Sequence, residues 1–422
     1  MRAEGWLGRA TRKVTAHAVE KGLQRLADAA RTRDPLPLVI VLPNGEQVHF
    51  GAPPKITLTI RDEAALAALA QPTMAALGEA FVEGRVDLDG PMLEAVALAE
   101  RLAALGGSPV GARVAGVFSR HTPKQDREAI AYHYDVGNEF YRLWLDERMV
   151  YSCAYFRTGE ESIDEAQLAK LDHICRKLRL APGERFLDIG CGWGGLIIHA
   201  AQKYGVRAIG ITLSEAQQRL AAERIAAAGL GERCQALLLD YREAVKRFGA
   251  ESFDKVASVG MFEHVGLRNL GTYFGIVREL LRERGLFLNH GITSADVDSR
   301  PVGSGVGDFI GTYVFPHGEL PHVSLALREM AAQGFEVVDV ESLRPHYAKT
   351  LQHWSNRLEA RLPEARRLVD EKTLRIWRAY LAGCSYGFTR HWINIYQLLG
   401  SKQTQPGLTE LPLTRDWMYA PA

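Results

Sequence analysis

The stretch FLDIGCGWGG, residues 186–195, constrains the fold more than any other segment. Apolar residues typical of a buried strand lead to Asp188, and four of the seven residues after it are glycine. Glycine loses much conformational entropy on folding, so a cluster of glycines after a strand indicates that something must approach the backbone closely. The segment therefore predicts a strand followed by a ligand-binding turn.

Strands and helices alternate from residue 185 onward. RFLDI, VRAIGIT, CQALLLD, FDKVASVG and GLFLNHGI have strand character, and helical segments such as GGLIIHAAQKY and SEAQQRLAAERIAAAG separate them. This order predicts an α/β domain with a doubly wound, mostly parallel sheet. In such sheets a ligand binds at the carboxyl ends of the strands, where the glycine turn lies.

The chain before this domain has a different character. Residues 1–34 predict a basic amphipathic helix, which either lies on a membrane surface or docks on its own domain. Residues 35–105 predict a small α+β domain suited to lipid or membrane docking, and Gly and Pro mark 106–118 as a linker. The catalytic domain is then expected over 119–402, with a tail at 403–422.

Composition argues against several classes of protein. A net charge of +1 over 422 residues gives no strong field and no sign of a nucleic-acid partner. No window of about 18 apolar residues predicts a transmembrane helix, and no signal peptide is evident. The five cysteines are irregularly spaced without a CxxC pair, which indicates free thiols in a reducing compartment and no zinc site. A cytoplasmic protein without a metal is expected.

Polar residues at the strand ends distinguish between cofactors. GCGWGG also fits the dinucleotide pattern GxGxxG, but Asp188 would repel a pyrophosphate and could accept from an ammonium group. The next strand ends at Thr212, where nicotinamide-binding folds usually carry Asp or Glu. Asp240 ends the third strand and can accept from an adenine amino group, while Tyr241 can stack on the ring. These features favour S-adenosylmethionine over NAD.

Seven segments then occur in order: YHYDVGNEFYRLWLD, YSCAYF, LDIGCGWGGL, ITLSEAQ, DYRE, SVGMFEHVG and PHYAKTLQHW. Together they resemble the cyclopropane-fatty-acyl-phospholipid synthases and their mycolic-acid-modifying relatives, over roughly residues 120–400. The resemblance implies a class I methyltransferase fold. It also implies methyl transfer from S-adenosylmethionine to the cis double bond of an unsaturated phospholipid acyl chain, through a carbocation that closes to a cyclopropane. Because family members commonly dimerise, a homodimer is expected, peripherally associated with the inner face of the membrane.

The resemblance also implies two groups of site residues. The cofactor site would comprise Tyr151, Ser152, Asp188, Gly190, Gly192, Thr212, Leu213, Gln217, Asp240, Tyr241 and Arg242. A bicarbonate ion, the family's base, would be held by Cys153, Glu263, His290, the backbone of Ile292, and Tyr347, with Tyr134 as a pocket residue. Bicarbonate offers both a donor and acceptors, so Glu263 could accept its hydroxyl while His290 and Tyr347 donate to its oxygens.

Two departures from the family pattern leave the product open. Gly291 stands where the family often has a larger residue, and PVGSGVGDFIG, residues 301–311, is unusually rich in glycine. The product could be a cyclopropane, a methylene branch or a methyl branch, and the acyl chain could be carried by a phospholipid or by a carrier protein. A small-molecule N- or O-methyltransferase and a lipid-binding protein on a retired methyltransferase fold are more distant alternatives.

Overall fold

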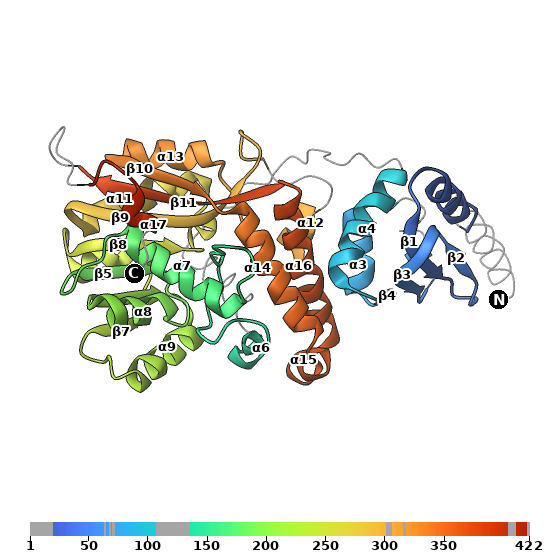
Figure 1. Cartoon of the computed structure of the whole chain (residues 1–422), viewed down its shortest axis with the longest axis horizontal. Coiled ribbons are helices and arrows are strands. Elements are labelled where there is room, and N and C mark those ends of the chain that lie inside the picture. Colours follow the sequence, from blue (N-terminus) through green and yellow to red (C-terminus); the bar gives the residue numbers. More distant parts are fainter. Residues whose placement is uncertain are drawn as a thin grey trace, which may run out of the picture. The chain divides into compact units, whose positions relative to one another are not determined.

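The computed structural model describes residues 20–62, 65–66, 69, 72–106, 136–300, 306–314, 318–403 and 411–419. Three predicted features lie outside these residues: the first part of the basic helix, the linker after Gly106, and Tyr134. The chain forms two compact units, drawn in Figure 1. The first comprises Met1–Val114, Val302–Val314 and Ser355–Tyr386, and the second comprises Ala115–Pro301, Phe315–Trp354 and Gly387–Ala422.

The first unit is built around a four-stranded mixed sheet in the order β2-β1-β3-β4. Its strands are β1 (Leu36–Val41), β2 (Gln47–His49), β3 (Gly51–Ile60) and β4 (Val86–Asp89). A turn at Asn44-Gly45 joins the antiparallel strands β1 and β2. Asn44 accepts from the Glu46 amide and Gly45 has a φ of 85°, which suits glycine.

Helices cover this sheet and bury its apolar face. They are the helix at residues 20–33, α3 (Met74–Val82) and α4 (Met92–Leu105). Leu23, Leu26 and Ala30 of the first helix are buried in the same core as the strands. The apolar stripe of residues 20–33 is therefore covered by the core of the first unit.

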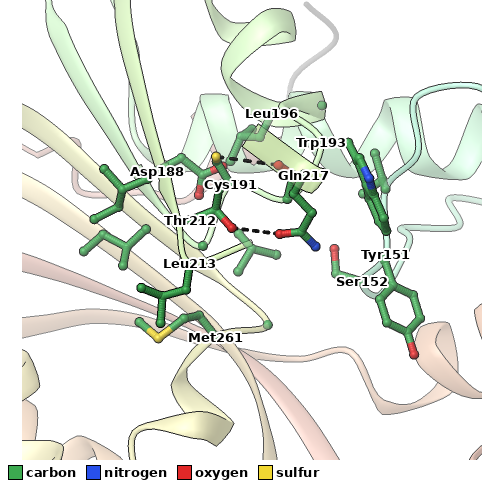
Figure 2. Close-up of a pocket in the computed structure, with 18 of the residues that line it drawn as sticks. Tyr151, Ser152, Asp188, Cys191, Trp193, Leu196, Thr212, Leu213, Gln217 and Met261 are labelled. Atoms are coloured by element: carbon green, nitrogen blue, oxygen red, sulfur yellow. Dashed lines mark hydrogen bonds between the residues drawn. The ribbon is translucent and has the colours of Figure 1, made fainter. Parts of the chain in front are cut away.

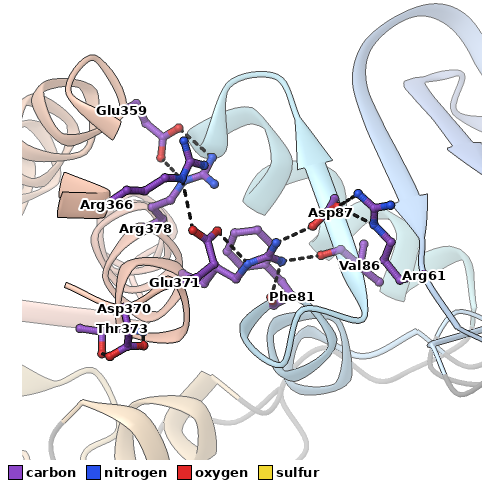
Figure 3. A network of polar contacts seen from close by, with 11 residues as sticks. Arg61, Phe81, Val86, Asp87, Glu359, Arg366, Asp370, Glu371, Thr373 and Arg378 are labelled. Atoms are coloured by element: carbon purple, nitrogen blue, oxygen red, sulfur yellow. Dashed lines mark hydrogen bonds and ion pairs between the residues drawn. The ribbon is translucent and has the colours of Figure 1, made fainter. Parts of the chain in front are cut away.

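Segments from late in the chain complete the first unit. These are α12 (Val306–Tyr313), α15 (Leu362–Leu368) and most of α16 (Glu371–Thr389). Arg375 of α16 donates to the carbonyls of Phe81 and Val86, both at 2.9 Å, and pairs with Asp87 (Figure 3). These bonds tie α16 to the turn between α3 and β4, so this unit contains residues far beyond the predicted small domain.

The second unit contains a seven-stranded sheet in the order β10-β11-β9-β8-β5-β6-β7. The strands are β5 (Arg185–Ile189), β6 (Arg207–Thr212), β7 (Cys234–Leu238), β8 (Phe253–Val259), β9 (Leu281–Ser294), β10 (Phe335–Ser342) and β11 (Ile393–Lys402). Strands β7, β6, β5, β8 and β9 are mutually parallel, and β11 runs antiparallel to both of its neighbours. The predicted α/β fold with a mostly parallel sheet is confirmed.

Helices lie on both faces of this sheet (Figure 1). One core contains side chains of α7 (Ile163–Lys177), α8 (Gly195–Tyr204), α9 (Glu215–Ala227) and α17 (Asp416–Tyr419). The opposite core contains side chains of α10 (Ala244–Phe248), α11 (Leu270–Leu280) and α13 (Val323–Ala332). Local signals fix the starts of two helices, since Ser162 and Glu165 form a capping box on α7 and Ser214 caps α9.

The remaining elements are short or connect the layers. They are α6 (Asn138–Arg142), α14 (Arg344–Glu359) and the 3₁₀ turns η1 (Tyr241–Glu243), η2 (Phe262–His264) and η3 (Leu267–Asn269). Within the described residues, no helix has the length and apolarity needed to cross a bilayer. Strand β5 is the topological switch point, because β6 and β7 follow on one side of it while β8 and β9 follow on the other. A ligand site is expected at the carboxyl end of β5.

Candidate active site

The glycine turn after β5 adopts a backbone that side chains would disturb. Gly190 and Gly192 have φ angles of 84° and 54°, in the left-handed region. A Cβ added to Gly190 would lie 2.9 Å from the Cβ of Met261. The amides of Gly190 and Cys191 both donate to the Ile211 carbonyl, at 2.9 and 3.0 Å. The turn is therefore fixed against β6 and leaves an open backbone surface.

A cavity of about 130 Å³ lies over this turn (Figure 2). All but one of the predicted cofactor residues line it, namely Tyr151, Ser152, Asp188, Gly190, Gly192, Thr212, Leu213, Gln217, Tyr241 and Arg242. The hydroxyl of Thr212 donates to Gln217 Oε1 at 2.8 Å, which closes the wall at the end of β6. The structure thus brings together residues that are spread over about 90 positions of the sequence.

Asp240, the remaining predicted cofactor residue, is not among the lining residues. Its carboxylate accepts from the amide of Arg242 at 3.0 Å, and from the Nε and Nη2 of the same residue at 2.9 and 2.7 Å. The Arg242 guanidinium lies 5.3 Å from the centre of the Tyr241 ring. Asp240 therefore orients two lining residues at this end of the cavity.

Asp188 lines the cavity from the carboxyl end of β5. It is only 2% exposed, and its Oδ1 has no hydrogen-bond partner among the described residues. Burial raises the pKa of Asp188 to about 7, although the nearby charge of Lys170 opposes the shift. A buried carboxylate with an unused oxygen suits a cationic guest such as an ammonium group.

Aromatic rings support the wall that carries Tyr151. The Tyr151 ring lies 5.4 Å from Trp144 and 5.3 Å from Trp354, measured between ring centres. Tyr141 packs 5.0 Å from Trp193 of the glycine turn. Tyr141 and Trp144, which lie in the segment YHYDVGNEFYRLWLD, are fully buried and are core residues. Their packing holds Tyr151 and the glycine turn in fixed positions.

Glu263 is a predicted bicarbonate residue whose two carboxylate oxygens have different surroundings. It lies in η2 and is 9% exposed. Its Oε1 accepts from the Ile292 amide at 2.6 Å, while Oε2 is buried without a partner among the described residues. Burial raises the pKa of Glu263 to about 7, against the opposing effect of the Ile292 bond. The Ile292 amide therefore donates to Glu263 and orients the Glu263 side chain.

His290 lies on β9, two residues before Ile292, and is fully buried. Its Nδ1 is 3.2 Å from Nε2 of Gln397 on β11, the residue paired with it across the sheet. An amide nitrogen can only donate, so Nδ1 accepts and the ring hydrogen resides on Nε2. Burial holds the pKa of His290 well below its usual value, so the ring is neutral. Nε2 has no partner among the described residues, and it is thus an unused buried donor.

Cys153 and Tyr347 occupy neighbouring positions. Cys153 is fully buried, and its thiol lies 3.2 and 3.8 Å from the carbonyls of Ala154 and Leu343. Burial holds the pKa of this thiol far above its usual value, so it is a neutral donor and no nucleophile. The Tyr347 amide donates to the same Leu343 carbonyl at 3.0 Å, and its ring packs on Phe388.

Backbone bonds connect these residues into one network. The Leu343 amide donates to the Ile395 carbonyl at 3.0 Å, and Ile395 is paired with Ile292 across β11 and β9. Cys153 and Tyr347 thus meet at Leu343, and Leu343 is joined through β11 to the strand that holds His290 and Ile292. This network contains the predicted residues from four separate sequence motifs.

Gly291, the predicted departure from the family pattern, has a specific neighbour. A Cβ added to Gly291 would lie 2.3 Å from the ring of Phe262, which precedes Glu263. The Phe262 ring is 1% exposed and occupies the space that a side chain at position 291 would need. A larger residue at this position would displace the turn that carries Glu263.

Sequence reasoning missed several polar residues of the site. Lys170 lines the cofactor cavity and donates to the Ser152 hydroxyl at 2.9 Å. Gln167 donates to the carbonyls of Val150 and Ser152 at 3.1 and 2.8 Å. One signal was available, because both polar residues occur on the apolar face of α7 among buried alanines and leucine. Gln397 gave no such signal, since it lies far along the chain in β11.

A second cavity, of about 120 Å³, lies in the first unit. Its lining is entirely apolar and includes side chains from β3, α3, α4 and α16. Phe309 of the glycine-rich segment at 301–311 lines this cavity and is not among the residues that line the cofactor cavity. The two cavities therefore differ in chemistry, since only the one over the glycine turn carries charged side chains.

Comparison with known families agrees with this description of the chain. Residues 121–398 match the model of the mycolic acid cyclopropane synthetase family. Residues 29–104 match a domain of unknown function, DUF7884, which corresponds to the sheet and helices of the first unit.

Individual relatives are similar over most of the chain. A probable fatty acid methyltransferase of Pseudomonas putida is 49% identical over 91% of this chain and 96% of the relative. The cyclopropane-fatty-acyl-phospholipid synthase of Escherichia coli is 38% identical over 70% of this chain and 74% of the relative.

Two solved structures are similar to the catalytic part. The cyclopropane synthase MmaA2 from Mycobacterium tuberculosis is 33% identical, with a TM-score of 0.61 over 65% of this chain and 98% of the other. The mycolic acid cyclopropane synthase CmaA1, solved with SAH and CTAB, is also 33% identical, with a TM-score of 0.61 over 68% and 99%. With its class I fold and its cavity over the glycine turn, this chain belongs to the mycolic acid cyclopropane synthetase family of S-adenosylmethionine-dependent methyltransferases.

Proposed function

We propose that the enzyme transfers the methyl group of S-adenosylmethionine to the cis double bond of an unsaturated phospholipid acyl chain and closes it to a cyclopropane. The names of the Escherichia coli and Mycobacterium tuberculosis relatives support this reaction class. One observation of the structure carries the proposal: a buried acceptor, Glu263 Oε2, and a buried donor, His290 Nε2, both lack a protein partner among the described residues. Buried polar groups of this kind are costly unless a guest satisfies them.

The cofactor cavity provides the first half of the chemistry. Bound there, S-adenosylmethionine supplies an electrophilic methyl group on a cationic sulfur. Asp188 would accept from the ammonium group of the cofactor, and Thr212 and Gln217 would hold the ribose region. Tyr241 and Arg242, oriented by Asp240, would frame the adenine. An alkene is a weak nucleophile, so fixed positions and exclusion of water are the main contributions that the protein can make.

The network around Glu263 provides the second half. After methyl transfer, a proton must leave the added carbon before a ring can close. Bicarbonate is the base that the family resemblance implies, and the donors and acceptors present here fit it. Glu263 Oε2 would accept its hydroxyl, His290 Nε2 would donate to an oxygen, and the phenol of Tyr347 would be a further donor. The Cys153 thiol would donate to bicarbonate only by turning away from the carbonyls of Ala154 and Leu343. Bound bicarbonate would supply a small base inside an apolar site.

A second candidate product is a methylene- or methyl-branched acyl chain. The Pseudomonas putida relative is named a probable fatty acid methyltransferase, and a relative that is 37% identical over 66% of this chain is named a tuberculostearic acid methyltransferase. A hydride shift along the acyl chain would move the cation to the carbon that bears the added methyl, and loss of a proton from that methyl would then give the methylene branch, which a later reduction would convert to a methyl branch. The position of Phe262 beside Gly291 bears on this choice because it fixes where Glu263 lies.

The acyl substrate and its location complete the proposal. Phospholipid chains in a membrane would require peripheral association of the enzyme with the cytoplasmic face, with the first unit as the docking part and a homodimer as the assembly. A carrier-protein-bound acyl chain is the alternative form of the substrate. Vesicles containing unsaturated phospholipids, compared with the same acyl chain on a carrier protein, distinguish the two when each is supplied as sole substrate.

The product is tested by expressing the full chain in a bacterial host that lacks its own synthase. Mass spectrometry of phospholipid acyl chains should show a gain of one CH₂ per double bond. Loss of all alkene signals by NMR, with new high-field ring protons, identifies the cyclopropane, whereas retained alkene protons identify the methylene branch. Unchanged acyl chains, together with methylation of a small amine or alcohol, would contradict the proposal.

A further inference from the structure

Two buried side chains of α7 hold the segment that forms one wall of the cofactor cavity. Gln167, which is fully buried, donates to the carbonyls of Val150 and Ser152 at 3.1 and 2.8 Å. Lys170, one turn further along and 1% exposed, donates to the Ser152 hydroxyl at 2.9 Å. The backbone and the side chain of Ser152 are therefore both fixed from the same helix face.

Lys170 also provides positive charge at the end of the cavity that Asp188 lines. Among the described lining residues, Lys170 and Arg242 carry an ammonium or a guanidinium group. Arg242 is bonded to Asp240 near the β7 end of the lining. Lys170 instead interacts electrostatically with Asp188, whose Oδ1 has no hydrogen-bond partner among the described residues. A buried anion and a buried cation thus lie at one end of a single cavity.

The bond between Lys170 and Ser152 determines what Ser152 can do. An ammonium group is only a donor, so the Ser152 oxygen must accept from Lys170. The hydroxyl hydrogen of Ser152 is then directed away from Lys170, and Ser152 lines the cavity beside Tyr151 (Figure 2). Ser152 is therefore set as a donor toward the cavity, strengthened by the adjacent positive charge.

We propose that Lys170 positions the amino-acid end of S-adenosylmethionine, by fixing Ser152 as the donor to the cofactor carboxylate and by balancing the charge of that carboxylate. Asp188 takes the ammonium group of the same end, so the zwitterion of the cofactor meets a matching pair of buried charges. This inference rests on the cofactor and is independent of the acyl substrate and the product.

The electrostatics of Lys170 are consistent with this role. Burial lowers the pKa of Lys170 to about 8, while the charges of Asp146 and Asp188 oppose this shift. A carboxylate that arrives beside Ser152 would stabilise the charged form of Lys170 further. The lysine is therefore charged when the cofactor is bound.

Calorimetric titration of the full chain tests the proposal with two ligands that differ by one group. S-adenosylmethionine carries the carboxylate, and decarboxylated S-adenosylmethionine lacks it. Lys170→Met should weaken binding of the first ligand about tenfold or more, because a charge-assisted contact is lost. Binding of the second ligand should stay within about twofold of the wild type. Lys203→Met, which removes a half-exposed lysine of α8, is the matched control and should change neither.

A second variant keeps the test decisive if Lys170→Met proves unstable. Ser152→Ala should give the same loss, restricted to the ligand with a carboxylate. The loss of binding free energy in the double variant should be smaller than the sum of the losses in the two single variants, since both residues act through one contact. Equal weakening of both ligands would show a purely structural role for Lys170, and unchanged binding of both would show no role; either result overturns the proposal.

Discussion

Two sets of buried carboxylates in the second unit have opposite surroundings. On β10, Asp339 and Glu341 share the fully buried ammonium of Lys177, at 3.0 and 2.6 Å. At the ends of β5 and in η2, Asp188 and Glu263 each keep one carboxylate oxygen without a hydrogen-bond partner among the described residues. The first set is satisfied by the protein itself, whereas in the second set one buried oxygen of each carboxylate has no hydrogen-bond partner among the described residues.

The pKa values follow this difference. Burial raises the pKa of Glu341, but the bond from His173 and the charge of Lys177 outweigh it and hold the pKa at about 2. Burial is not outweighed at Asp188 and Glu263, where the pKa rises to about 7. The comparison teaches that burial of a carboxylate alone does not identify a site; an unmatched carboxylate that faces a cavity or lies beside an unmatched donor does.

We expect the largest effect on stability from removing Lys177, the cation that Asp339 and Glu341 share. Lys177→Met should destabilise the protein by about 3–5 kcal/mol, because Asp339 and Glu341 lose their shared buried cation and keep only Arg415 and His173 as partners. Denaturant unfolding followed by circular dichroism measures the loss. Lys203→Met serves as control with a small effect, since the lysine is half exposed and its partner Asp172 keeps the bond to His199. A loss below about 1 kcal/mol would show that the pair on β10 is not what holds this region together.

Substitution of Glu263, in contrast, should reduce activity without reducing stability. Glu263→Gln should lower the rate of methyl transfer to the acyl chain about 100-fold or more, because the buried carboxylate oxygen Oε2 is lost. Its unfolding free energy at neutral pH should not fall, since the variant no longer buries an uncompensated charge. Glu341→Gln is the matched control: it should cost stability while leaving the turnover of each folded molecule near the wild-type value. Equal losses of activity in Glu263→Gln and Glu341→Gln would contradict the distinction between the two sets of carboxylates.

The affinity for S-adenosylmethionine should depend on whether Asp188 is ionised. The free carboxyl has a pKa of about 7, and a bound ammonium group favours its charged form. Affinity for S-adenosylmethionine should therefore rise roughly tenfold between about pH 5.5 and pH 7, with proton release on binding. Calorimetry in two buffers with different ionisation enthalpies measures the released proton. In Asp188→Asn the proton release should disappear; its persistence would place the titrating group elsewhere.

The smallest expected effect is the change in the free energy of unfolding with pH. The folded-state pKa of Glu263 is raised above its unfolded value of 4.5, so the folded state retains a proton that the unfolded state has lost. Stability should then decline as the pH rises from about 5 to 7, by about 1 kcal/mol or more from this group. Urea unfolding at pH 5 and pH 8 should show a smaller decline in Glu263→Gln than in the wild type. An identical decline in both would indicate that Glu263 is already ionised in the folded state.

Much of this organisation could be predicted from sequence because it depends on local signals. The alternation of strands and helices gave the parallel sheet, and the glycines after Asp188 gave the ligand turn. Glu263, His290 and Cys153 followed from motifs that resemble a known family. Their connection through Leu343 and β11 could not be predicted, because backbone pairing between distant strands leaves no mark in any one segment.

Other features escaped prediction because burial is decided by tertiary packing. Lys170 and Lys177 have the same chemistry as exposed helix lysines, and only the packing of α7 makes them buried partners of acidic groups. The first unit likewise recruits α16 from near the end of the chain, where Arg375 meets the carbonyls of Phe81 and Val86. Nothing in the composition of residues 35–105 indicates that this arginine is needed.

The order of the strands bears on how the enzyme is made. The last strand in the sequence, β11, lies between β9 and β10 in the interior of the sheet, and it supplies Gln397 to His290. During synthesis, β9 has no partner on that side until the ribosome has released residues beyond 400. The contact between Gln397 and His290 therefore forms only after β11 has been synthesised, and a nascent chain interrupted before β11 would expose an aggregation-prone sheet edge.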